Sequence, residues 1–240
     1  MSRLLEVKAL TKHFGGVTAI DCLDFALEER ELHCLIGPNG AGKSTFFKLV
    51  TGRIRPSSGT IMFRGRDITR LSSARRVQAG MSIKMQVPGI FPNLPVEQNI
   101  ATALQRRLDR AAVRAESDRL LTFVGLEQQR HRLAGELAHG QKQWLEIAMA
   151  VGLSPALLFL DEPTAGLSPE ETRHTGEMVL ELNRQGMTVL VVEHDMAFVR
   201  QIARMVTVLH FGRTFARGTI DEIIAHEGVQ EIYLGKAQDA

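Results

Sequence analysis

The chain has 240 residues, of which 44% are hydrophobic and 23% are charged, and its formal net charge is +2. This composition excludes a disordered polypeptide, and the small net charge gives no argument for a nucleic-acid partner. No stretch approaches the roughly 18 to 20 uninterrupted apolar residues of a membrane helix, and the start lacks the apolar run of a secretory signal, so we expect a cytoplasmic chain.

The first third of the chain shows mainly the alternating pattern of strands. LLEVKAL (4–10) and DFALEE (24–29) alternate, whereas ELHCLIG (31–37) is an apolar run that ends at a glycine-rich loop opening a helix. GTIMFRGRDI (59–68) predicts a hairpin that turns at Arg64 and Gly65. We expect antiparallel strands with one parallel core strand here. Cys22 and Cys34 lack metal-ligand spacing and are predicted to be small buried hydrophobes.

The middle of the chain changes character from about Leu71. Pro88, Pro92 and Pro95 interrupt a loop, and helical patterns then run over about 96–152. We interpret this stretch as a helical lobe, about 86–155, inserted into a core lobe of about 1–85 and 156–240. The whole chain would form a single domain.

The last third alternates between strands and helices. Strands are expected at ALLFLDE (156–162), MTVLVVEH (187–194) and MVTVLHFG (205–212), with helices at 169–185 and 196–203 between them. Such alternation implies parallel strands joined by helical crossovers. The last helix is predicted to begin near Thr219, because Thr219 and Glu222 have capping-box spacing.

A phosphate-binding motif follows the strand at 31–37. Gly37 to Ser44 fits G-x-x-x-x-G-K-[ST] between a strand and a helix, whereas a merely tight turn would not need lysine and serine after the last glycine. The glycines let backbone N–H groups point at phosphates, Lys43 would contact the outer phosphates, and Ser44 would ligate Mg²⁺. The predicted ATP-binding residues of this loop are Gly37, Pro38, Asn39, Gly40, Ala41, Gly42, Lys43, Ser44 and Thr45.

Two adjacent acids end the buried strand at 156–162. Carboxylates at the C-terminal edge of a parallel sheet face the ligand crevice. Asp161 would hold Mg²⁺ through its water shell, and Glu162 would orient or deprotonate an attacking water. Such a pair is weak evidence alone, but the phosphate-binding loop upstream gives it meaning.

These motifs, together with LAHGQKQWLEI from Leu137 and VVEHD from Val191, resemble the ABC transporter ATPase family over essentially the whole chain. The resemblance implies an α/β P-loop ABC ATPase fold: a mixed sheet core, an antiparallel N-terminal β subdomain and an inserted helical subdomain. It implies ATP and Mg²⁺ as cofactors. It also implies a composite site, in which ATP lies between the P-loop of one subunit and the signature loop of its partner.

The resemblance also implies roles for single residues. Phe14 would stack on adenine, with Val17 and Ala19 nearby, although a core aromatic is the alternative. Gln86 matches the glutamine loop that reaches Mg²⁺ and the attacking water and senses the membrane subunits. His194 matches the switch histidine that contacts the γ-phosphate, with a structural histidine as the alternative.

The signature loop of this chain departs from the family's usual LSGGQ. Ala138, His139, Gly140 and Gln141 occupy the positions that contact the partner's ATP, and Ala138 cannot offer the usual hydroxyl. Backbone N–H groups at Gly140 and the helix start remain, so we expect function to survive. AGLSPEE (165–171) takes the place of the loop that crosses the dimer interface, and its Ser168 also fits a helix N-cap.

Within the family, AHGQKQWLEI, FPNLPVEQNI and the terminal YLG resemble importers of branched-chain amino acids and urea, with the signature leaning to urea or short-chain amides. The implied partners are a second ABC ATPase subunit, two membrane permease subunits and, indirectly, a solute-binding protein. A heterodimer is favoured over a homodimer, and the chain would sit on the cytoplasmic face of the membrane.

Two other functions compete with transport. A soluble ABC ATPase acting on nucleic acid or the ribosome would usually carry two cassettes or a long coiled-coil insertion, and this sequence shows neither. A P-loop kinase would have no use for the signature loop or for His194.

Overall fold

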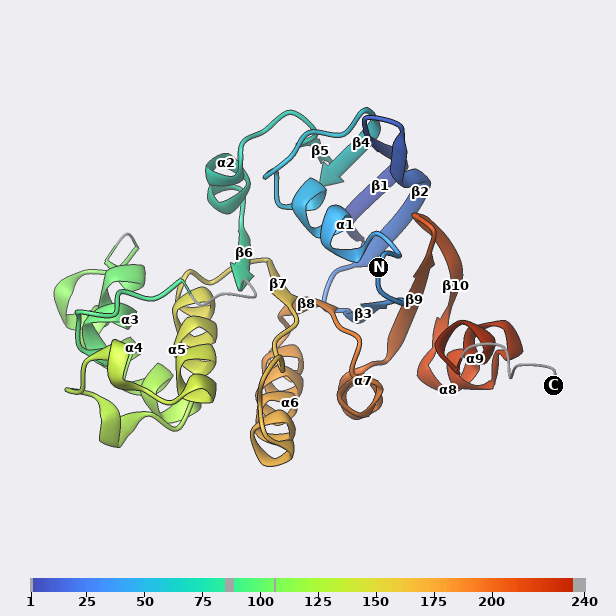
Figure 1. Cartoon of the computed structure of the whole chain (residues 1–240). Coiled ribbons are helices and arrows are strands. Elements are labelled where there is room, and N and C mark those ends of the chain that lie inside the picture. The colour runs from blue at the N-terminus through green and yellow to red at the C-terminus, as the bar shows by residue number, and fades with distance from the viewer. Residues whose placement is uncertain (1, 85–88, 106, 235–240) are drawn as a thin grey trace.

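The computed structural model describes residues 2–84, 89–105 and 107–234, and its strands form two sheets (Figure 1). The first sheet is antiparallel with strand order β2-β1-β4-β5. Its hairpin turns at Arg64 and Gly65, both with positive φ, which confirms the predicted turn. Its strands are β1 (Arg3–Phe14), β2 (Val17–Glu28), β4 (Ser58–Phe63) and β5 (Arg66–Asp67).

The second sheet has strand order β10-β9-β3-β8-β7-β6 and is parallel except for β10. The predicted strands at 31–37, 156–162 and 187–194 are present, whereas the one at 205–212 stops at His210. The prediction missed the edge strands β6 and β10, whose sequences MSIK and RTFARGT carry few apolar residues. The strands are β3 (Leu32–Ile36), β6 (Met81–Lys84), β7 (Leu157–Asp161), β8 (Thr188–Val192), β9 (Met205–His210) and β10 (Arg213–Thr219).

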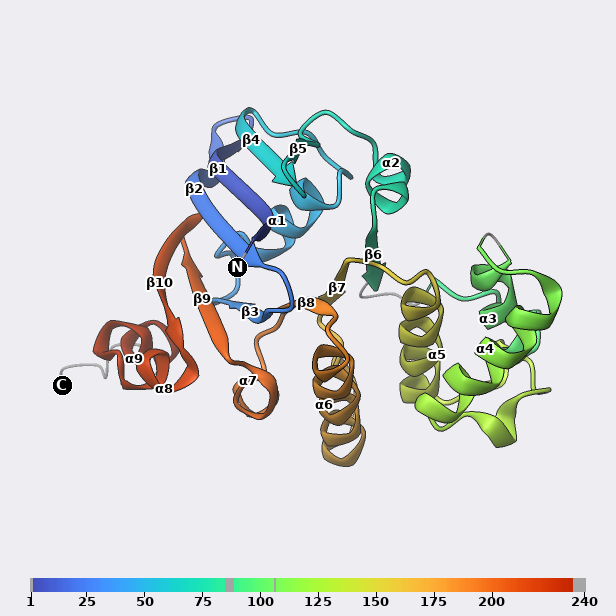
Figure 2. The same cartoon turned by 180° about the vertical axis from the view of Figure 1, so that it is seen from behind.

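Helix α1 lies between the sheets, α6 and α7 lie below the second sheet, α2 lies next to β6, and α8 and α9 lie next to β10 (Figures 1 and 2). Helices α3, α4 and α5 form a separate cluster beside α6, where helical patterns were predicted (Figures 1 and 2). Thr219 caps α8 as predicted, but α9 follows it, so α8 is not the last helix. The helices are α1 (Lys43–Val50), α2 (Ser73–Gln78), α3 (Val96–Leu104), α4 (Arg110–Phe123), α5 (His139–Gly152), α6 (Pro169–Arg184), α7 (Met196–Ile202), α8 (Ile220–Ala225) and α9 (Glu227–Leu234).

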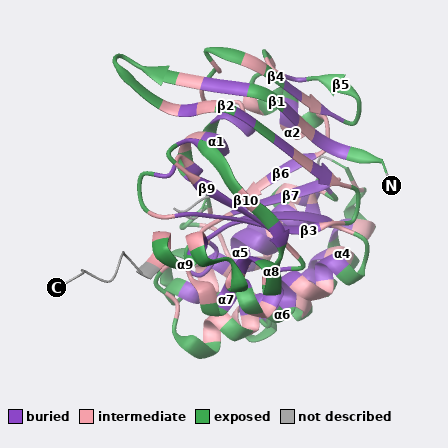
Figure 3. Cartoon of the chain, turned by 90° about the vertical axis from the view of Figure 1, so that its right-hand side faces the viewer, coloured by how far each residue is buried: buried purple, intermediate pink, exposed green. Residues whose placement is uncertain are grey.

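The second sheet is buried on both faces, which explains its continuous apolar strands. In β7, Leu157 and Phe159 pack into a core that α1 shares with the first sheet, whereas Leu158 and Leu160 pack toward the helices on the other face. Figure 3 shows this buried centre between more exposed edges. The arrangement holds β3, β7 and β8 rigidly side by side, so the loops after these strands start from fixed points.

Of the two cysteines, Cys34 is buried as predicted and Cys22 is exposed, which corrects the prediction for Cys22. Cys22 lies at an irregularity of the β1–β2 ladder, with a φ of 45°, and its N–H donates to Thr11 Oγ1 over 3.1 Å. The irregularity reverses the inward and outward alternation at this point. Among the described residues, no helix is both long and apolar enough to span a membrane.

Candidate nucleotide-binding site

The glycine-rich loop lies between the buried strand β3 and helix α1, as the motif requires. Gly37 has a φ of 156°, and a Cβ there would come within 2.4 Å of the Leu209 carbonyl oxygen. Gly42 precedes the helix in a left-handed conformation, and a Cβ there would come within 2.7 Å of the Ala19 oxygen. Only glycine fits at either point, so the neighbouring strands hold the loop in its cradle shape.

Lys43 is folded back over this loop. Its Nζ donates to the backbone oxygens of Gly37 over 2.6 Å and of Pro38 over 3.0 Å, and the side chain is buried. Burial lowers the pKa of Lys43, while the carboxylates of Glu162, Glu193 and Asp161 oppose that shift. The ammonium group is therefore held above the mouth of the loop and facing the acidic strand ends.

A pocket of about 380 Å³ opens in front of the loop. Its lining combines the residues of the loop with apolar side chains such as Val17 and Phe211. Because Glu162 shares this lining with the loop, the structure brings the two predicted motifs to one cavity. The loop residues that line it are Asn39, Gly40, Ala41, Gly42, Lys43, Ser44 and Thr45, joined by Val17, Thr18, Ala19, Glu162, Phe211 and Gly212.

The predicted acids and the histidine meet at the carboxyl ends of β7 and β8. Glu162 has a φ of 44°, an uncommon conformation for a residue other than glycine, and its N–H donates to the Val192 oxygen over 2.9 Å. His194 Nδ1 lies 3.5 Å from Glu162 Oε1, and the imidazole is 57% exposed. A group bound at the loop could therefore contact both side chains at once.

Asp161 ends β7 in a largely buried position. Burial, together with the adjacent Glu162 carboxylate, raises the pKa of Asp161 to about 6. The cationic side chains of Lys84 and Arg53 oppose this shift without cancelling it, and a bound cation would stabilise the carboxylate further. Hard oxygen ligands such as Asp161 and the Ser44 hydroxyl suit Mg²⁺, and phosphate oxygens and water would complete its shell.

The sequence analysis missed two buried charged residues of the site. Glu193 accepts hydrogen bonds from Thr164 Oγ1 and from the N–H of His194, so it ties the segment after Glu162 to the histidine loop. Lys84 is the last residue of β6 and is fully buried. Its Nζ donates to the backbone oxygen of Glu162 over 3.5 Å. The sequence VVEH (191–194) places Glu193 directly before the histidine, but no pattern in the neighbouring residues indicates that the Glu193 carboxylate points inward.

The signature loop does not share this pocket. His139 Nε2 lies 3.0 Å from the Ala165 oxygen, and Gly140 packs against Glu171, so the loop contacts the segment 165–171. Gln141 Oε1 accepts from the Ala138 N–H over 3.1 Å, while Ala138 has no side-chain oxygen to return the cap. The N-terminal end of α5 consequently faces outward with Ala138 and His139 exposed.

The predicted adenine contact, Phe14, is the last residue of β1. Phe14 is 49% exposed, which excludes the core aromatic, and it pairs with Val17 across the β1–β2 hairpin. Among the described residues, Val17 lines the pocket but Phe14 does not. Gln86 lies outside the described residues.

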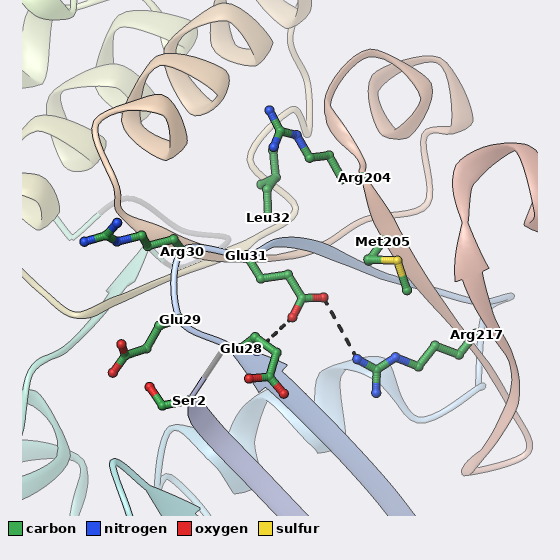
Figure 4. Close-up of a pocket in the computed structure, with 9 residues that line it drawn as sticks. All are labelled: Ser2, Glu28, Glu29, Arg30, Glu31, Leu32, Arg204, Met205 and Arg217. Carbon is green, nitrogen blue, oxygen red and sulfur yellow. Dashed lines mark hydrogen bonds and ion pairs between the residues drawn. The ribbon is translucent and has the colours of Figure 1, made fainter.

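A larger cavity of about 640 Å³ lies where β3 begins, at the end of the second sheet opposite to the phosphate-binding loop. Figure 4 shows Glu31 reaching between Glu28 and Arg217 at this cavity. Glu31 also bonds to His33 Nδ1 over 2.8 Å, and Thr207 Oγ1 lies 2.8 Å from His33 Nε2. These contacts link residues of β2, β3, β9 and β10 and are structural, because the phosphate-binding loop leaves the opposite end of β3.

Acidification should destabilise the protein through His33. Burial lowers the pKa of His33 despite the opposing hydrogen bond to Glu31, so below its ordinary value near 6.5 the unfolded chain binds the proton more readily. The contribution of His33 to the free energy of unfolding is therefore fully present above that pKa, and it is lost as the pH falls toward the pKa of the folded state. The free energy of unfolding, measured in urea, should therefore be lower at about pH 5.5 than at about pH 7.5.

The matched variant is His33→Gln, which keeps a hydrogen-bonding side chain without titrating. Its free energy of unfolding should change less over the same pH range than that of the original chain. Equal pH dependence in the two proteins would show that His33 is not the responsible group.

Comparisons with known proteins agree with this geometry. The family model described as ABC transporter matches residues 20–165. The high-affinity branched-chain amino acid transport ATP-binding protein LivG of Salmonella typhimurium is 37% identical, covering 98% of each chain. Its counterpart BraF of Pseudomonas aeruginosa is 35% identical over 99% of this chain and all of that protein.

A solved structure has the same fold. The ADP conformation of MJ1267, an ATP-binding cassette of an ABC transporter, superposes with a TM-score of 0.87 at 27% identity, covering 98% of this chain and all of that one. The match includes both sheets and the helical cluster, so the expected α/β P-loop fold is confirmed. The chain belongs to the ABC transporter family, as one of its ATP-binding, ATP-hydrolysing members.

Proposed function

We propose that the chain is the ATP-hydrolysing subunit of an ABC importer for branched-chain amino acids or for urea and short-chain amides. The convergence of the loop at Lys43, the acids Asp161 and Glu162, and His194 on one edge of the sheet carries the proposal. The signature motif favoured urea or short-chain amides as the transported solute, whereas the relatives described above are named for branched-chain amino acids. The solute class therefore includes both.

The geometry suggests how the chain's own groups act on ATP. Loop N–H groups and the N-terminus of α1 would hold the phosphates, with Lys43 turning its ammonium toward them. Ser44, Asp161 and Gln86 would hold Mg²⁺, which supplies charge neutralisation at the outer phosphates. Glu162 would accept a proton from the attacking water, and His194 would orient the γ-phosphate beside it.

The metal assignment fits what the chain offers. Among the residues that the structure describes, no group of three or more His, Cys, Asp or Glu side chains could hold a metal. Mg²⁺ in phosphoryl-transfer sites keeps several waters and binds through one or two carboxylates plus phosphates. Asp161 with Ser44 would form such a partial site, which fits a metal that arrives with its nucleotide.

A second ATPase subunit would complete the site. Of the signature residues, His139 and Gly140 contact the segment 165–171, and none of Ala138, His139, Gly140 and Gln141 lines the pocket of their own chain. The start of α5 presents backbone N–H groups outward, which suits a phosphate held by another subunit. We propose a dimer, with a heterodimer favoured, in which each signature loop covers the partner's ATP.

An apolar surface on the helical lobe fits the permease subunits. Phe91 and Leu133 are 47% and 41% exposed, and the Gly135 N–H donates to the Pro92 oxygen over 2.9 Å, which joins their two segments. Asn99 exchanges two hydrogen bonds with the backbone of Phe91, so the loop is rigid. This surface is the proposed contact with the membrane subunits on the cytoplasmic face. The whole chain would act as one ATPase domain.

Replacing Phe91 and Leu133 together by serine should reduce the permease subunits that copurify with the chain from membranes by at least about tenfold. ATP binding by the purified variant should be unchanged, because the substitutions lie outside the pocket. Phe215→Ser, which changes an equally exposed ring on β10, is the control and should retain the permeases.

The same purification tests the proposed function. Permeases that copurify with the unaltered chain support transport, whereas nucleic acid or ribosomal components in their place would support the alternative of a soluble ATPase switch. Unimpaired copurification of the double variant would reject this docking surface.

A further inference from the structure

Phe211 occupies a backbone conformation that phenylalanine rarely adopts. It forms the two-residue turn between β9 and β10 with Gly212, flanked by the paired residues His210 and Arg213. Both turn residues have positive φ, 45° for Phe211 and 74° for Gly212. Turns of this kind favour asparagine, aspartate or glycine at the first position, so an aromatic side chain here is strained.

Burial does not explain why this position carries a phenylalanine. The side chain of Phe211 is 79% exposed, more than any other large hydrophobic side chain among the described residues. Its ring touches the His210 ring, with centroids 4.2 Å apart. A strained residue whose apolar ring is left in solvent points to a function outside the folded core.

The turn is fixed against the phosphate-binding loop. The Gly212 N–H donates to the Ala41 oxygen over 2.9 Å, and the Gly212 oxygen accepts from Asp21 over the same distance. A Cβ on Gly212 would come within 2.7 Å of the Ala19 oxygen. The backbone of the turn is therefore held rigidly by the loop and by β2. The position of this backbone fixes the Cα atom from which the Phe211 side chain extends.

The lining of the pocket in front of the loop combines polar and apolar groups. Lys43 and Glu162 mark where phosphates would lie, whereas Phe211 and Val17 line the same cavity with exposed apolar surface. Phe14, the strand partner of Val17, adds a second exposed ring next to Val17. A nucleotide has the same combination, with charged phosphates at one end and a flat aromatic base at the other.

We infer that Phe211 is a nucleobase-contacting residue and forms, with Val17, the base subsite of the pocket, next to the exposed ring of Phe14. This inference rests on the proposed use of the pocket for ATP. An aromatic ring recognises the face of a base and not its hydrogen-bonding edge, so Phe211 contributes affinity for purine nucleotides in general. It does not contribute affinity for the phosphate chain.

The test compares ligands with and without a base on the full-length chain. Phe211→Asn removes the ring and places a residue that the turn tolerates, so the fold is kept. Its dissociation constant for ADP should rise about tenfold, while that for inorganic tripolyphosphate should not change. Phe211→Tyr should bind ADP as the original chain does, and Lys43→Ala should weaken both ligands.

The outcomes separate this inference from the function on which it rests. Unchanged ADP affinity in Phe211→Asn, with Lys43→Ala impaired, would overturn the base contact alone. An equal loss for ADP and tripolyphosphate in Phe211→Asn would show that the turn acts on the loop, and would also overturn it. Unchanged affinities in Lys43→Ala would overturn the assignment of the pocket and this inference with it.

Discussion

Glu162→Gln is expected to reduce ATP hydrolysis by the intact transporter at least about 100-fold, while its affinity for ATP stays within about twofold. The amide has the shape of the carboxylate but cannot accept a proton from water. Glu162 lies 3.5 Å from His194 at the mouth of the pocket, and its conformation is held by the hydrogen bond to Val192. The substitution therefore removes the base without moving the site.

Phosphate release by the purified complex measures the rate, and equilibrium binding of a labelled nucleotide measures the affinity. Glu170→Gln, an exposed residue in the first turn of α6, is the matched control and should hydrolyse ATP normally. Hydrolysis near the normal rate in Glu162→Gln would remove Glu162 from the role of general base.

Lys43→Ala is expected to weaken binding of ATP and ADP at least about 100-fold. The ammonium is the one lysine group that lines the pocket among the described residues, and charge-assisted hydrogen bonds to phosphate are the strong ones. Its present acceptors, the oxygens of Gly37 and Pro38, would compete poorly with phosphate. Isothermal titration of the full chain with ADP measures the effect.

Loss of Lys43 also removes two hydrogen bonds that brace the loop, so unfolding in urea should be recorded for the same sample. Lys48→Ala changes an exposed lysine one turn later on α1 and should bind ADP normally. A folded Lys43→Ala protein that bound nucleotide as tightly as the original would contradict the phosphate role of this loop.

The phosphate-binding loop could be predicted from the sequence because its chemistry is local. Glycine, lysine and serine at fixed spacing between a strand and a helix dictate both the shape and the ligand, and the structure places them as expected. Asp161, Glu162 and His194 were predictable for a similar reason. Each lies at or just after the carboxyl end of an apolar strand, and the carboxyl ends of adjacent parallel strands meet at one edge of the sheet.

Phe211 could not be found in this way. MVTVLHFG was interpreted as strand through Gly212, whereas the chain turns at Phe211 and returns as β10, an edge strand with few apolar residues. The turn matters only because the sheet order places β9 beside β3, which brings it to the loop about 170 residues earlier. Glu193 and Lys84 were missed on similar grounds, because their inward direction follows from tertiary packing.

ATP hydrolysis by this chain is proposed to drive import, and ATP-dependent uptake tests this coupling most directly. The chain, its copurified permeases and the associated solute-binding protein would be reconstituted in vesicles with ATP on the side of the ATPase. Labelled leucine and labelled urea would then be offered on the other side. We predict accumulation of one of these solutes with the original chain, and none with Glu162→Gln. Equal accumulation with both chains, or none with either while ATP is hydrolysed, would contradict the proposed function.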